Sequence, residues 1–380
     1  MRSKDRKHVL IVLGSFESGG AERQAVLLAE GLLQKGVNVT VLGFGTEKGI
    51  TWHRLQQKGI PAICSGFRSK ILSGHSSSKV RDYLLYLKYR VKLIFLVRSL
   101  KVDIALPFTY EPNVYFCSWF KSFGIIRCFW NQRDGGIGFD DSRIEKLAIS
   151  RASTVISNSI EGKKAIRKIS NREVVIIHNG VNIPAVSSHC CYENVVTVCM
   201  ISNIHQQKDH LTLLKAWKRV VERKNCKVKL NLIGRIESKN NLVVTETALY
   251  SMLLQFINDN GLADSVEFLG EVSDVQVHLQ KSQIAVFSSK LEGLPNGVLE
   301  AMAAGLPVVA TDIEGCREAL GFDYAYFSPV EDDQAMADLL LLFINDSNLR
   351  QEVGSRNRIR ANNEFSIQKM IDRYYELLNV

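Results

Sequence analysis

The amino-acid sequence predicts an α/β protein with two doubly wound domains, each a parallel β-sheet flanked by helices. The chain has 380 residues, of which 46% are hydrophobic, and this is enough for two cores. Residues 8–42 form an apolar strand, a glycine-containing loop, an amphipathic helix and a second apolar strand, the pattern of one βαβ unit. A second series of apolar strands begins at residue 195 and repeats this alternation.

The first domain is predicted to span residues 1–183. Its first strand is His8–Leu13, which follows a short basic segment that lacks the small-residue cleavage pattern of a signal peptide. A helix over residues 21–35 is expected to end at Gly36, because glycine favours a helix stop. Short apolar runs predict the remaining strands at residues 37–42, 60–64, 104–107, 125–130, 154–157 and 174–177.

The predicted linker, residues 184–194, contains proline and serines and has no periodicity. The second domain is predicted over residues 195–363. Its strands are expected at residues 195–200, 229–233, 266–269, 284–287 and 308–310, and the chain ends in a predicted helix at residues 366–378.

Two glutamates eight positions apart, Glu292 and Glu300, form the most informative pattern in the chain. A buried strand leads into a loop, and Asn296 is predicted to cap a helix that extends through Ala304. At this end of a parallel sheet a helix N-terminus can bind phosphate, while the two carboxylates accept hydrogen bonds from hydroxyl groups. That combination describes a nucleotide sugar. On spacing alone, Glu292 is equally well a solvated loop residue and Glu300 a helix residue favoured by the helix dipole.

The residues that follow favour the nucleotide sugar. Residues 292–315, EGLPNGVLEAMAAGLPVVATDIEG, resemble the donor-site signature of the retaining GT-B glycosyltransferases of family 4, also described as glycosyl transferases group 1. In that family the first glutamate contacts the donor sugar and the second the ribose, so the resemblance implies Glu292 as the catalytic residue and Glu300 as a ribose ligand. It also implies sugar-donor contacts for Gly293, Leu294, Asn296, Gly297 and Val298.

The resemblance further implies the GT-B fold, two Rossmann-like domains facing an interdomain cleft, with the segment 364–380 crossing back to the first domain. Residues 18–23, SGGAER, resemble the opening segment of the family, in which the glycine loop faces that cleft. Gly19 and Gly20 are therefore candidate sugar-donor contacts. Considered alone, two glycines at this position make a plain turn.

A lysine after the first strand of the second domain is a suitable point charge for a diphosphate. Residues 202–210, SNIHQQKDH, resemble the family segment whose arginine and lysine neutralise the departing diphosphate, and Lys208 occupies the lysine position. Asn203 occupies the arginine position, so one guanidinium is missing. His205, Arg235 or helix N–H groups are the candidates to compensate. Without this context Lys208 is an ordinary surface lysine.

Arg133 and Asp134 lie at the end of a predicted strand of the first domain and are candidates for acceptor binding. Many relatives carry a histidine in this segment and this chain has none, so the resemblance transfers no general base. An ordinary charged loop is the alternative. The nearby sequence Asn179-Gly180 is an Asn-Gly turn, to which we assign a structural role.

No metal and no cofactor are expected. Acidic pairs occur, but there is no Asp-x-Asp of the type that binds a nucleotide-bound metal, and the histidines are scattered. In the family that the chain resembles, helix N–H groups and a lysine replace the cation.

The formal net charge of +9 favours an anionic partner. Residues 79–101 combine basic residues with Leu, Tyr, Ile and Phe, which is typical of a basic amphipathic helix on an anionic membrane. A core-packed helix with a solvated basic face gives the same pattern. No nucleic-acid-binding motif is present, so nucleic acid is not an expected partner. The basic residues of the segment are Lys79, Arg81, Lys88, Arg90, Lys92, Arg98 and Lys101.

Together with the resemblance, the sequence predicts a glycosyltransferase. It would move a sugar from a UDP- or GDP-sugar, with retention, to a glycan or polyprenyl-linked glycan in the synthesis of a cell-surface polysaccharide such as O-antigen, capsule or lipopolysaccharide. The eight cysteines form no CxxC pair, which indicates reduced thiols and therefore a cytoplasmic protein. We expect it to be a peripheral protein on the inner face of the cytoplasmic membrane. Two alternatives remain open: a non-catalytic sugar-nucleotide-binding partner and a GT-B nucleotide-sugar epimerase.

Overall fold

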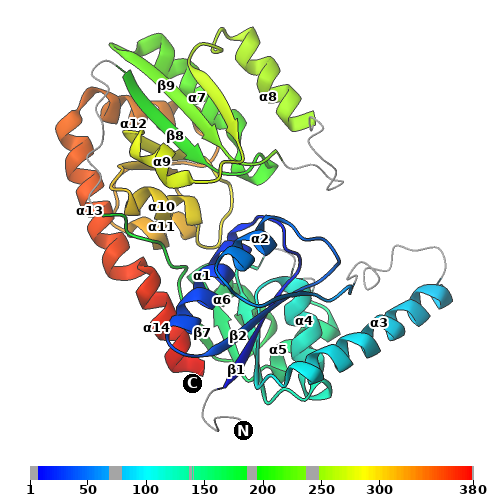
Figure 1. Cartoon of the computed structure of the whole chain (residues 1–380). Helices are drawn as coiled ribbons and strands as arrows, with labels where there is room; N and C mark the ends of the chain where they lie inside the picture. The colour runs from blue at the N-terminus through cyan, green and yellow to red at the C-terminus, as the bar shows by residue number, and fades with distance from the viewer. Residues whose placement is uncertain are drawn as a thin grey trace. The chain divides into compact units, whose positions relative to one another are not determined.

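The computed structural model describes residues 7–67, 79–136, 139, 141–185, 195–236 and 248–378. The chain divides into two compact units, each of which is an α/β structure (Figure 1). The first unit comprises Met1–Gly180 and Ile367–Val380, and the second comprises Val181–Ser366. The predicted boundary was residue 183, and most of the predicted linker lies outside the described residues.

In the described part of the first unit, seven parallel strands form one sheet in the order β3-β2-β1-β4-β5-β6-β7. The strands are β1 (His8–Leu13), β2 (Asn38–Gly43), β3 (Ala62–Cys64), β4 (Ile104–Pro107), β5 (Arg127–Gln132), β6 (Thr154–Ser157) and β7 (Val174–Ile176). The helices are α1 (Gly20–Gln34), α2 (Ile50–Gln57), α3 (Lys79–Leu100), α4 (Tyr110–Trp119), the 3₁₀ helix η2 (Phe120–Phe123), α5 (Arg143–Arg151), α6 (Ile160–Ile169) and α14 (Ile367–Leu378).

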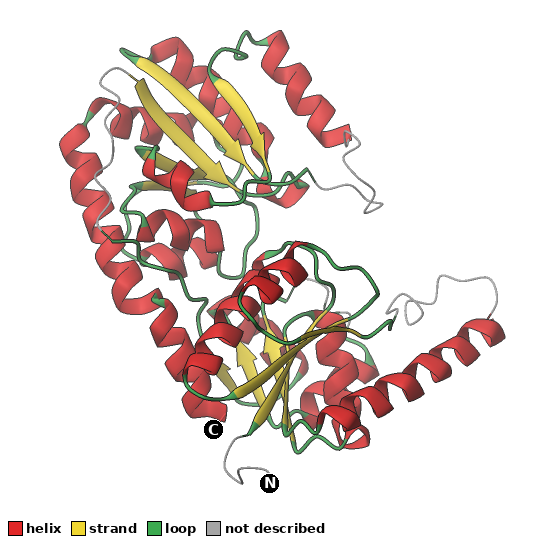
Figure 2. Ribbon diagram, in the orientation of Figure 1, coloured by secondary structure: helices red, strands yellow, loops and turns green. Residues whose placement is uncertain are grey.

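Strand β1 explains why the apolar runs of this unit are continuous rather than alternating. Val9 and Ile11 belong to one core with residues of α1 and α14, whereas Leu10 and Val12 belong to a second core with residues of α3, α4 and α5. Helices therefore cover both faces of the sheet, as Figure 2 shows, and both sets of side chains must be apolar.

In the described part of the second unit, six parallel strands form a sheet in the order β10-β9-β8-β11-β12-β13. The strands are β8 (Val195–Ile201), β9 (Lys227–Ile233), β10 (Val266–Gly270), β11 (Ile284–Phe287), β12 (Val308–Thr311) and β13 (Phe327–Ser328). The helices are the 3₁₀ helix η3 (Gln206–Lys208), α7 (His210–Arg223), α8 (Ala248–Asp259), α9 (Val275–Gln280), α10 (Asn296–Ala303), α11 (Glu314–Leu320), α12 (Asp333–Asn345) and α13 (Ser347–Phe365).

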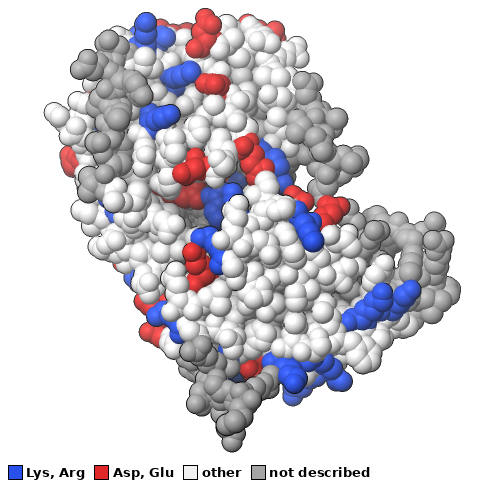
Figure 3. Space-filling model, in the orientation of Figure 1, with Lys and Arg blue, Asp and Glu red and all other residues white. Residues whose placement is uncertain are grey.

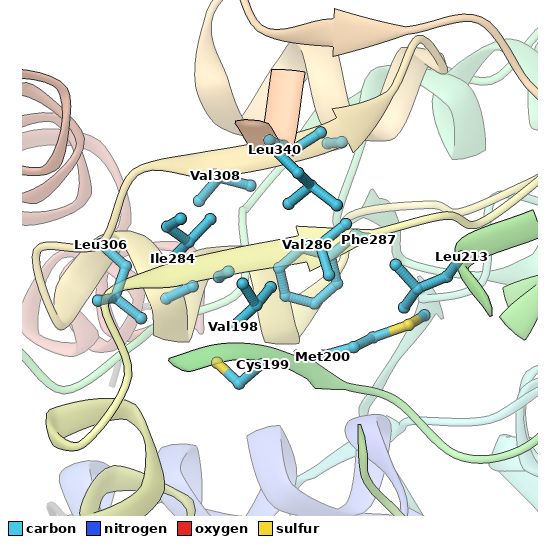
Figure 4. Close-up of a cluster of buried hydrophobic side chains, with 14 of the residues drawn as sticks. Val198, Cys199, Met200, Leu213, Ile284, Val286, Phe287, Leu306, Val308 and Leu340 are labelled. Atoms are coloured by element: carbon cyan, nitrogen blue, oxygen red, sulfur yellow. The ribbon is translucent and has the colours of Figure 1, made fainter. Parts of the chain in front are cut away.

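The central strands of this second sheet supply much of its core. Figure 4 shows Val198 of β8, Ile284 and Val286 of β11 and Val308 of β12 packed in one layer with Leu340 of α12. All five side chains are fully buried. This packing fixes the carboxyl ends of β8 and β11, from which the predicted sugar-donor residues follow.

The chain passes between the units twice, and the two crossing segments lie together. The N–H of Val181 donates to the carbonyl of Phe365 at 2.8 Å, and Val181 forms an isolated parallel bridge with Ser366. After Ser366 the last helix, α14, packs on α1 of the first unit. A Cβ added to Gly31 of α1 would lie 2.1 Å from Cδ1 of Ile371, so only glycine allows this close approach.

The predicted α/β fold with two doubly wound units is confirmed. Strands β1, β4, β6 and β11 have the predicted bounds, and the other predicted strands differ by one or two residues at an end. Strand β13 was not predicted, because two residues carry no hydrophobic pattern. No described helix has both the length and the apolar composition needed to span a bilayer.

Candidate functional site

Each sheet reverses its strand order at one point, and Gly19, Lys208 and Glu292 follow strands at these points, whereas Arg133 and Asp134 follow β5. In the first sheet the reversal lies between β1 and β4, and in the second it lies between β8 and β11. In open α/β sheets ligands bind outside the carboxyl ends of the strands at such a switch point. Lys208 follows β8 and Glu292 follows β11, so the fold brings these two residues to one place.

Lys208 and Glu292 form a direct ion pair, in which Nζ of Lys208 contacts Oε1 of Glu292. The lysine side chain is 27% exposed and the glutamate 16%, so water screens this pair less than a surface salt bridge. The hydroxyl of Ser289 donates a second hydrogen bond, at 2.9 Å, to the same carboxylate oxygen. The carboxylate is therefore held in one position by a cation and a hydroxyl.

Two serines connect the loops that carry this pair. Ser288 donates to the backbone carbonyl of Lys208 at 2.9 Å, and the carbonyl of Ser289 accepts from the hydroxyl of Thr311. Both serines are buried. The sequence predicts only a loop after this strand and not this role, because a Ser-Ser pair after a strand is also an ordinary loop sequence.

Gly315 allows a close approach behind the Glu292 loop. A Cβ at this position would lie 2.2 Å from the carbonyl oxygen of Gly293 and 2.8 Å from that of Glu292. Both neighbours are backbone atoms, which cannot rotate away. Gly315, the last residue of the segment that resembles the family's sugar-donor signature, is thus required for the position of the Glu292 loop.

Helix α10 begins one residue earlier than predicted. Pro295 occupies the N-cap position and Asn296 is the first helical residue, so the prediction that Asn296 caps the helix is wrong. Proline has a fixed φ, here −75°, that suits a helix entry, and the helix starts without a side-chain cap. Glu300 lies one turn inside and is only 9% exposed. The N–H groups at 296–298 belong to the first turn, which has no intrahelical acceptors for them.

Asn203, which stands at the family's arginine position, binds the neighbouring loop. Its Oδ1 accepts from the N–H of Arg235 at 3.1 Å, and the N–H of Ile204 donates to the carbonyl of Arg235 at 2.8 Å. Gly234 permits this approach, since a Cβ there would lie 2.1 Å from the carbonyl of Ser202. The loop after β9, with Arg235, is therefore fixed beside the loop after β8.

His210 follows Lys208 and is 2% exposed. Burial, together with the charge of Lys208, lowers the pKa of His210 from 6.5 to about 4, so this imidazole is neutral near pH 7. His205, the other histidine of the loop, is exposed, and its Nδ1 accepts from the N–H of Gln207 at 3.3 Å. His210 therefore supplies no positive charge near pH 7, while His205, a predicted substitute for the arginine, is an exposed residue of the same loop.

In the first unit, Gly19 lies between β1 and α1 as predicted, whereas Gly20 is the first residue of α1, one residue before the predicted helix start. Gly19 occupies the N-cap position of α1 with an extended backbone, and its carbonyl accepts from the N–H of Arg23 at 3.0 Å. A Cβ at Gly19 would meet only the flexible end of Glu22, at 2.2 Å. The local structure is thus an open helix start.

Arg133 follows β5 and is held from three sides. Its Nη2 donates to Oδ1 of Asn179 at 2.6 Å, its Nη1 lies 3.1 Å from the hydroxyl oxygen of Tyr374, and its Cζ lies 4.8 Å from the ring centroid of Phe108. Asn179 therefore has the structural role assigned to it, as the partner of a predicted site residue. The contact with Tyr374 could not be predicted, because 241 residues separate the two positions.

The carboxylate of Asp134 accepts hydrogen bonds from residues of its own loop. Its Oδ1 accepts from the side-chain amide of Gln132 and, at 3.1 Å, from the N–H of Gly136. Burial raises the pKa of the Asp134 carboxyl group, and these two hydrogen bonds oppose the shift. Asp134 thus shapes the loop beside Arg133.

Within the described ranges, no three His, Cys, Asp or Glu side chains come together in a way that could hold a metal ion. Metal-independent chemistry stays a prediction.

Comparison with known families places both halves of the chain in one group. Residues 18–184 match the family described as "Glycosyltransferase Family 4", and residues 195–346 match that described as "Glycosyl transferases group 1". The two matches include Gly19, Gly20 and Arg133 in the first unit and Lys208, Glu292 and Glu300 in the second.

Similarity to individual proteins extends over nearly the whole chain. The lipopolysaccharide core biosynthesis glycosyltransferase LpsE of Rhizobium meliloti is 24% identical over 95% of this chain and 96% of its own. A Campylobacter jejuni enzyme, N-acetylgalactosamine-N,N'-diacetylbacillosaminyl-diphospho-undecaprenol 4-alpha-N-acetylgalactosaminyltransferase, is 24% identical over 73% and 75% of the chains. The crystal structure of Anabaena HepE in complex with UDP and glucose has a TM-score of 0.83 at 20% identity, over 98% of this chain and 100% of that one. The chain belongs to the family 4 glycosyltransferases, the glycosyl transferases group 1, and has their GT-B fold.

Proposed function

We propose that this protein transfers a sugar, with retention of the anomeric configuration, from a UDP- or GDP-sugar to a glycan or lipid-linked glycan acceptor in the synthesis of a cell-surface polysaccharide. The observation that carries the proposal is the pairing of Lys208 with Glu292 at the switch point of the second sheet. The HepE complex with UDP and glucose supports a UDP-sugar as the donor.

The sugar donor would bind the second unit. Glu292 contacts the sugar and is the catalytic residue, Glu300 accepts hydrogen bonds from the ribose, and the N–H groups at 296–298 face the diphosphate, beside the loop residues Gly293 and Leu294. During transfer the bond from the anomeric carbon to the diphosphate breaks, so negative charge develops on the leaving oxygen. Lys208 and the N-terminus of α10 stabilise that charge, which is the role a metal has elsewhere.

Arg235 would supply the cation that Asn203 lacks. A hydrogen bond from its backbone to Asn203 fixes the Arg235 loop beside the loop that leads to Lys208. A guanidinium binds phosphate oxygens in a bidentate manner, which the Asn203 carboxamide cannot do. Asn203, which stands at the family's arginine position, would thus hold Arg235, the substitute cation, in place.

The acceptor would bind the first unit, where Arg133 and Asp134 are the candidate residues. The Campylobacter jejuni relative is named for a diphospho-undecaprenol acceptor and LpsE for lipopolysaccharide core synthesis, which supports a lipid-linked glycan. Such an acceptor lies at a membrane surface, so we propose peripheral association with the inner face of the cytoplasmic membrane.

Helix α3 offers a surface for this association, although not the face expected from its basic residues. Arg90 packs on the ring of Trp119, with Cζ 4.2 Å from the centroid, and does not face the lipid. The exposed stripe, within the described residues 87–100, consists of Lys88, Val91, Lys92, Phe95, Arg98 and Ser99, of which Phe95 is 69% and Val91 49% exposed. Residues 87–101 contain no acidic residue, and Figure 3 shows basic side chains on this helix.

Replacing Lys88 and Lys92 by glutamine should weaken binding to vesicles of anionic phospholipid by about 30-fold, because each basic residue at such a surface contributes about 1 kcal/mol. Vesicle sedimentation measures the loss. The control is the pair Arg167→Gln and Lys168→Gln, which removes the same charge from exposed positions on α6. Equal losses in both double variants would contradict a specific role for α3.

A panel of UDP- and GDP-sugars tests the function itself. The true sugar donor at 100 times its Kd should stabilise the protein by about 2.7 kcal/mol, visible as a shift in the thermal midpoint. Incubation with that donor and lipid-linked glycans should then give a product whose anomeric configuration NMR reports. Binding without transfer would point to a non-catalytic partner, and conversion of the donor without acceptor would point to an epimerase.

A further inference from the structure

The environment of Arg133 contains buried polar atoms that no protein group satisfies. Nδ2 of Asn131, Oδ1 of Asn158 and Nε of Arg133 are shielded from solvent and have no hydrogen-bond partner in the described structure. Asn131 is 0% and Asn158 1% exposed. Leaving buried polar groups unpaired is unfavourable, so a cluster of them indicates a place where a ligand can supply the missing hydrogen bonds.

These atoms belong to one connected network at the carboxyl end of the first sheet. The hydroxyl of Tyr374 bridges Nη1 of Arg133 and Oδ1 of Asn131, at 3.1 and 3.2 Å. Nδ2 of Asn158 donates to the carbonyl of Arg133 at 3.1 Å and also lies 3.3 Å from Oδ1 of Asn179. The hydroxyl of Thr109, which follows the Phe108 ring beneath the guanidinium, is another buried atom without a partner.

The guanidinium lacks a carboxylate partner. Its contacts are a hydroxyl, an amide oxygen and an aromatic ring, and no described Asp or Glu forms an ion pair with it. Glu22 acts on Arg133 through its charge without pairing with it. A half-buried arginine that is fixed by neutral groups, with Nε unused, retains its charge and its affinity for an oxyanion.

We infer that this cluster is a subsite for a sugar phosphate of the acceptor, with the phosphate on Arg133 and the sugar hydroxyls on Asn131, Asn158 and Thr109. This inference rests on the proposed function, and it specifies the acceptor as a phosphorylated glycan. The available groups include donors and acceptors of hydrogen bonds, which suits a ligand with both an oxyanion and hydroxyls. A neutral glycan would leave the arginine charge without a counter-ion.

Calorimetric titration of the full chain with inorganic phosphate and with glucose 1-phosphate, both under saturating UDP, tests the subsite. Saturating UDP occupies the phosphate-binding groups that we propose for the second unit, so that the probes cannot bind there. Wild type should bind both probes, and Arg133→Gln should bind them about 10- to 100-fold more weakly. Arg133→Lys should give an intermediate loss, because lysine keeps the charge but not the planar fork. UDP binding should be unchanged in both variants.

Arg127→Gln is the matched control. Arg127 lies at the other end of β5, donates to the carbonyls of Leu377 and Leu378 at 3.1 and 2.8 Å, and stacks on Phe129. It thus resembles Arg133 in its contacts with α14 but has no unsatisfied neighbours. Its variant should bind phosphate like wild type.

Three results would overturn the subsite: no phosphate binding by wild type under UDP, equal binding by Arg133→Gln, or weaker UDP binding by that variant, which would assign Arg133 to the sugar donor. Failure of the proposed function is a separate result, since it appears as absence of binding across the UDP- and GDP-sugar panel.

Discussion

Replacing Lys208 by glutamine should lower kcat for transfer by about 100- to 1000-fold, the usual effect of removing one preorganised group that stabilises a developing negative charge. A second loss of activity is expected, because Glu292 would lose its cationic partner while its carboxylate stays largely shielded from water. Steady-state kinetics with the identified sugar donor and acceptor measure the change. The loss should fall mainly on kcat, since charge on the leaving diphosphate is greatest in the transition state.

Glu292→Gln should also lose activity, and the double variant should lose less than the two single losses combined, because the two residues act as a pair. Lys290→Gln is the control: this lysine lies in the same loop but pairs with Glu331 and, at 3.7 Å, with Asp209 rather than with Glu292, and its side chain is 41% exposed. It should retain wild-type activity. Arg235→Gln tests the substitute cation. If Lys208→Gln keeps a kcat within a few-fold of wild type, Lys208 does not stabilise the leaving group.

Gly315→Ala should abolish most transfer activity and reduce the free energy of unfolding by about 1–3 kcal/mol, the usual cost of inserting a methyl group where there is no space. The added Cβ would overlap the carbonyl oxygens of Gly293 and Glu292, at 2.2 and 2.8 Å. Because these are backbone atoms, relief requires the Glu292 loop to move away from Lys208 and Ser289. Denaturant titration and transfer kinetics on the same preparation measure both effects.

Gly261→Ala separates the two effects. Gly261 lies in the same unit with φ of +63° and open space around its Cβ position, so alanine there adds backbone strain of about 1–2 kcal/mol without moving the site. This variant should be destabilised to a similar extent but remain active. A Gly315→Ala protein with normal kcat would show that the loop adjusts without losing its function.

The sequence predicted those parts of the structure that depend on local pattern. Strand Ile284–Phe287 was found at its predicted bounds because a short buried strand is a continuous apolar run. Lys208 and Glu292 were both predicted as sugar-donor residues because each follows such a strand and lies in a segment that resembles the sugar-donor site of the family. Their direct contact was not predicted, since it depends on β8 and β11 being neighbours in the sheet.

Other features lie beyond local pattern. Asn296 is a good N-cap residue, yet Pro295 takes that position, because two adjacent residues with suitable chemistry leave the exact start of a helix open. The partners of Arg133 come from the segments that follow β4 and β7 and from α14, and no sequence spacing relates them. On α3, the identity of the exposed basic residues depends on Trp119, which removes Arg90 from the exposed stripe.

The paired crossing segments have a consequence for how this protein can be dissected. Since Val181 is bonded to Phe365 and bridged to Ser366, the second unit begins and ends at one spot. In the first unit a Cβ at Gly180 would lie 2.9 Å from Cα of Ile367, so the two ends left by removing the second unit also meet. In chain order the second unit is thus inserted into the first. A short peptide could close each part into a continuous chain of its own.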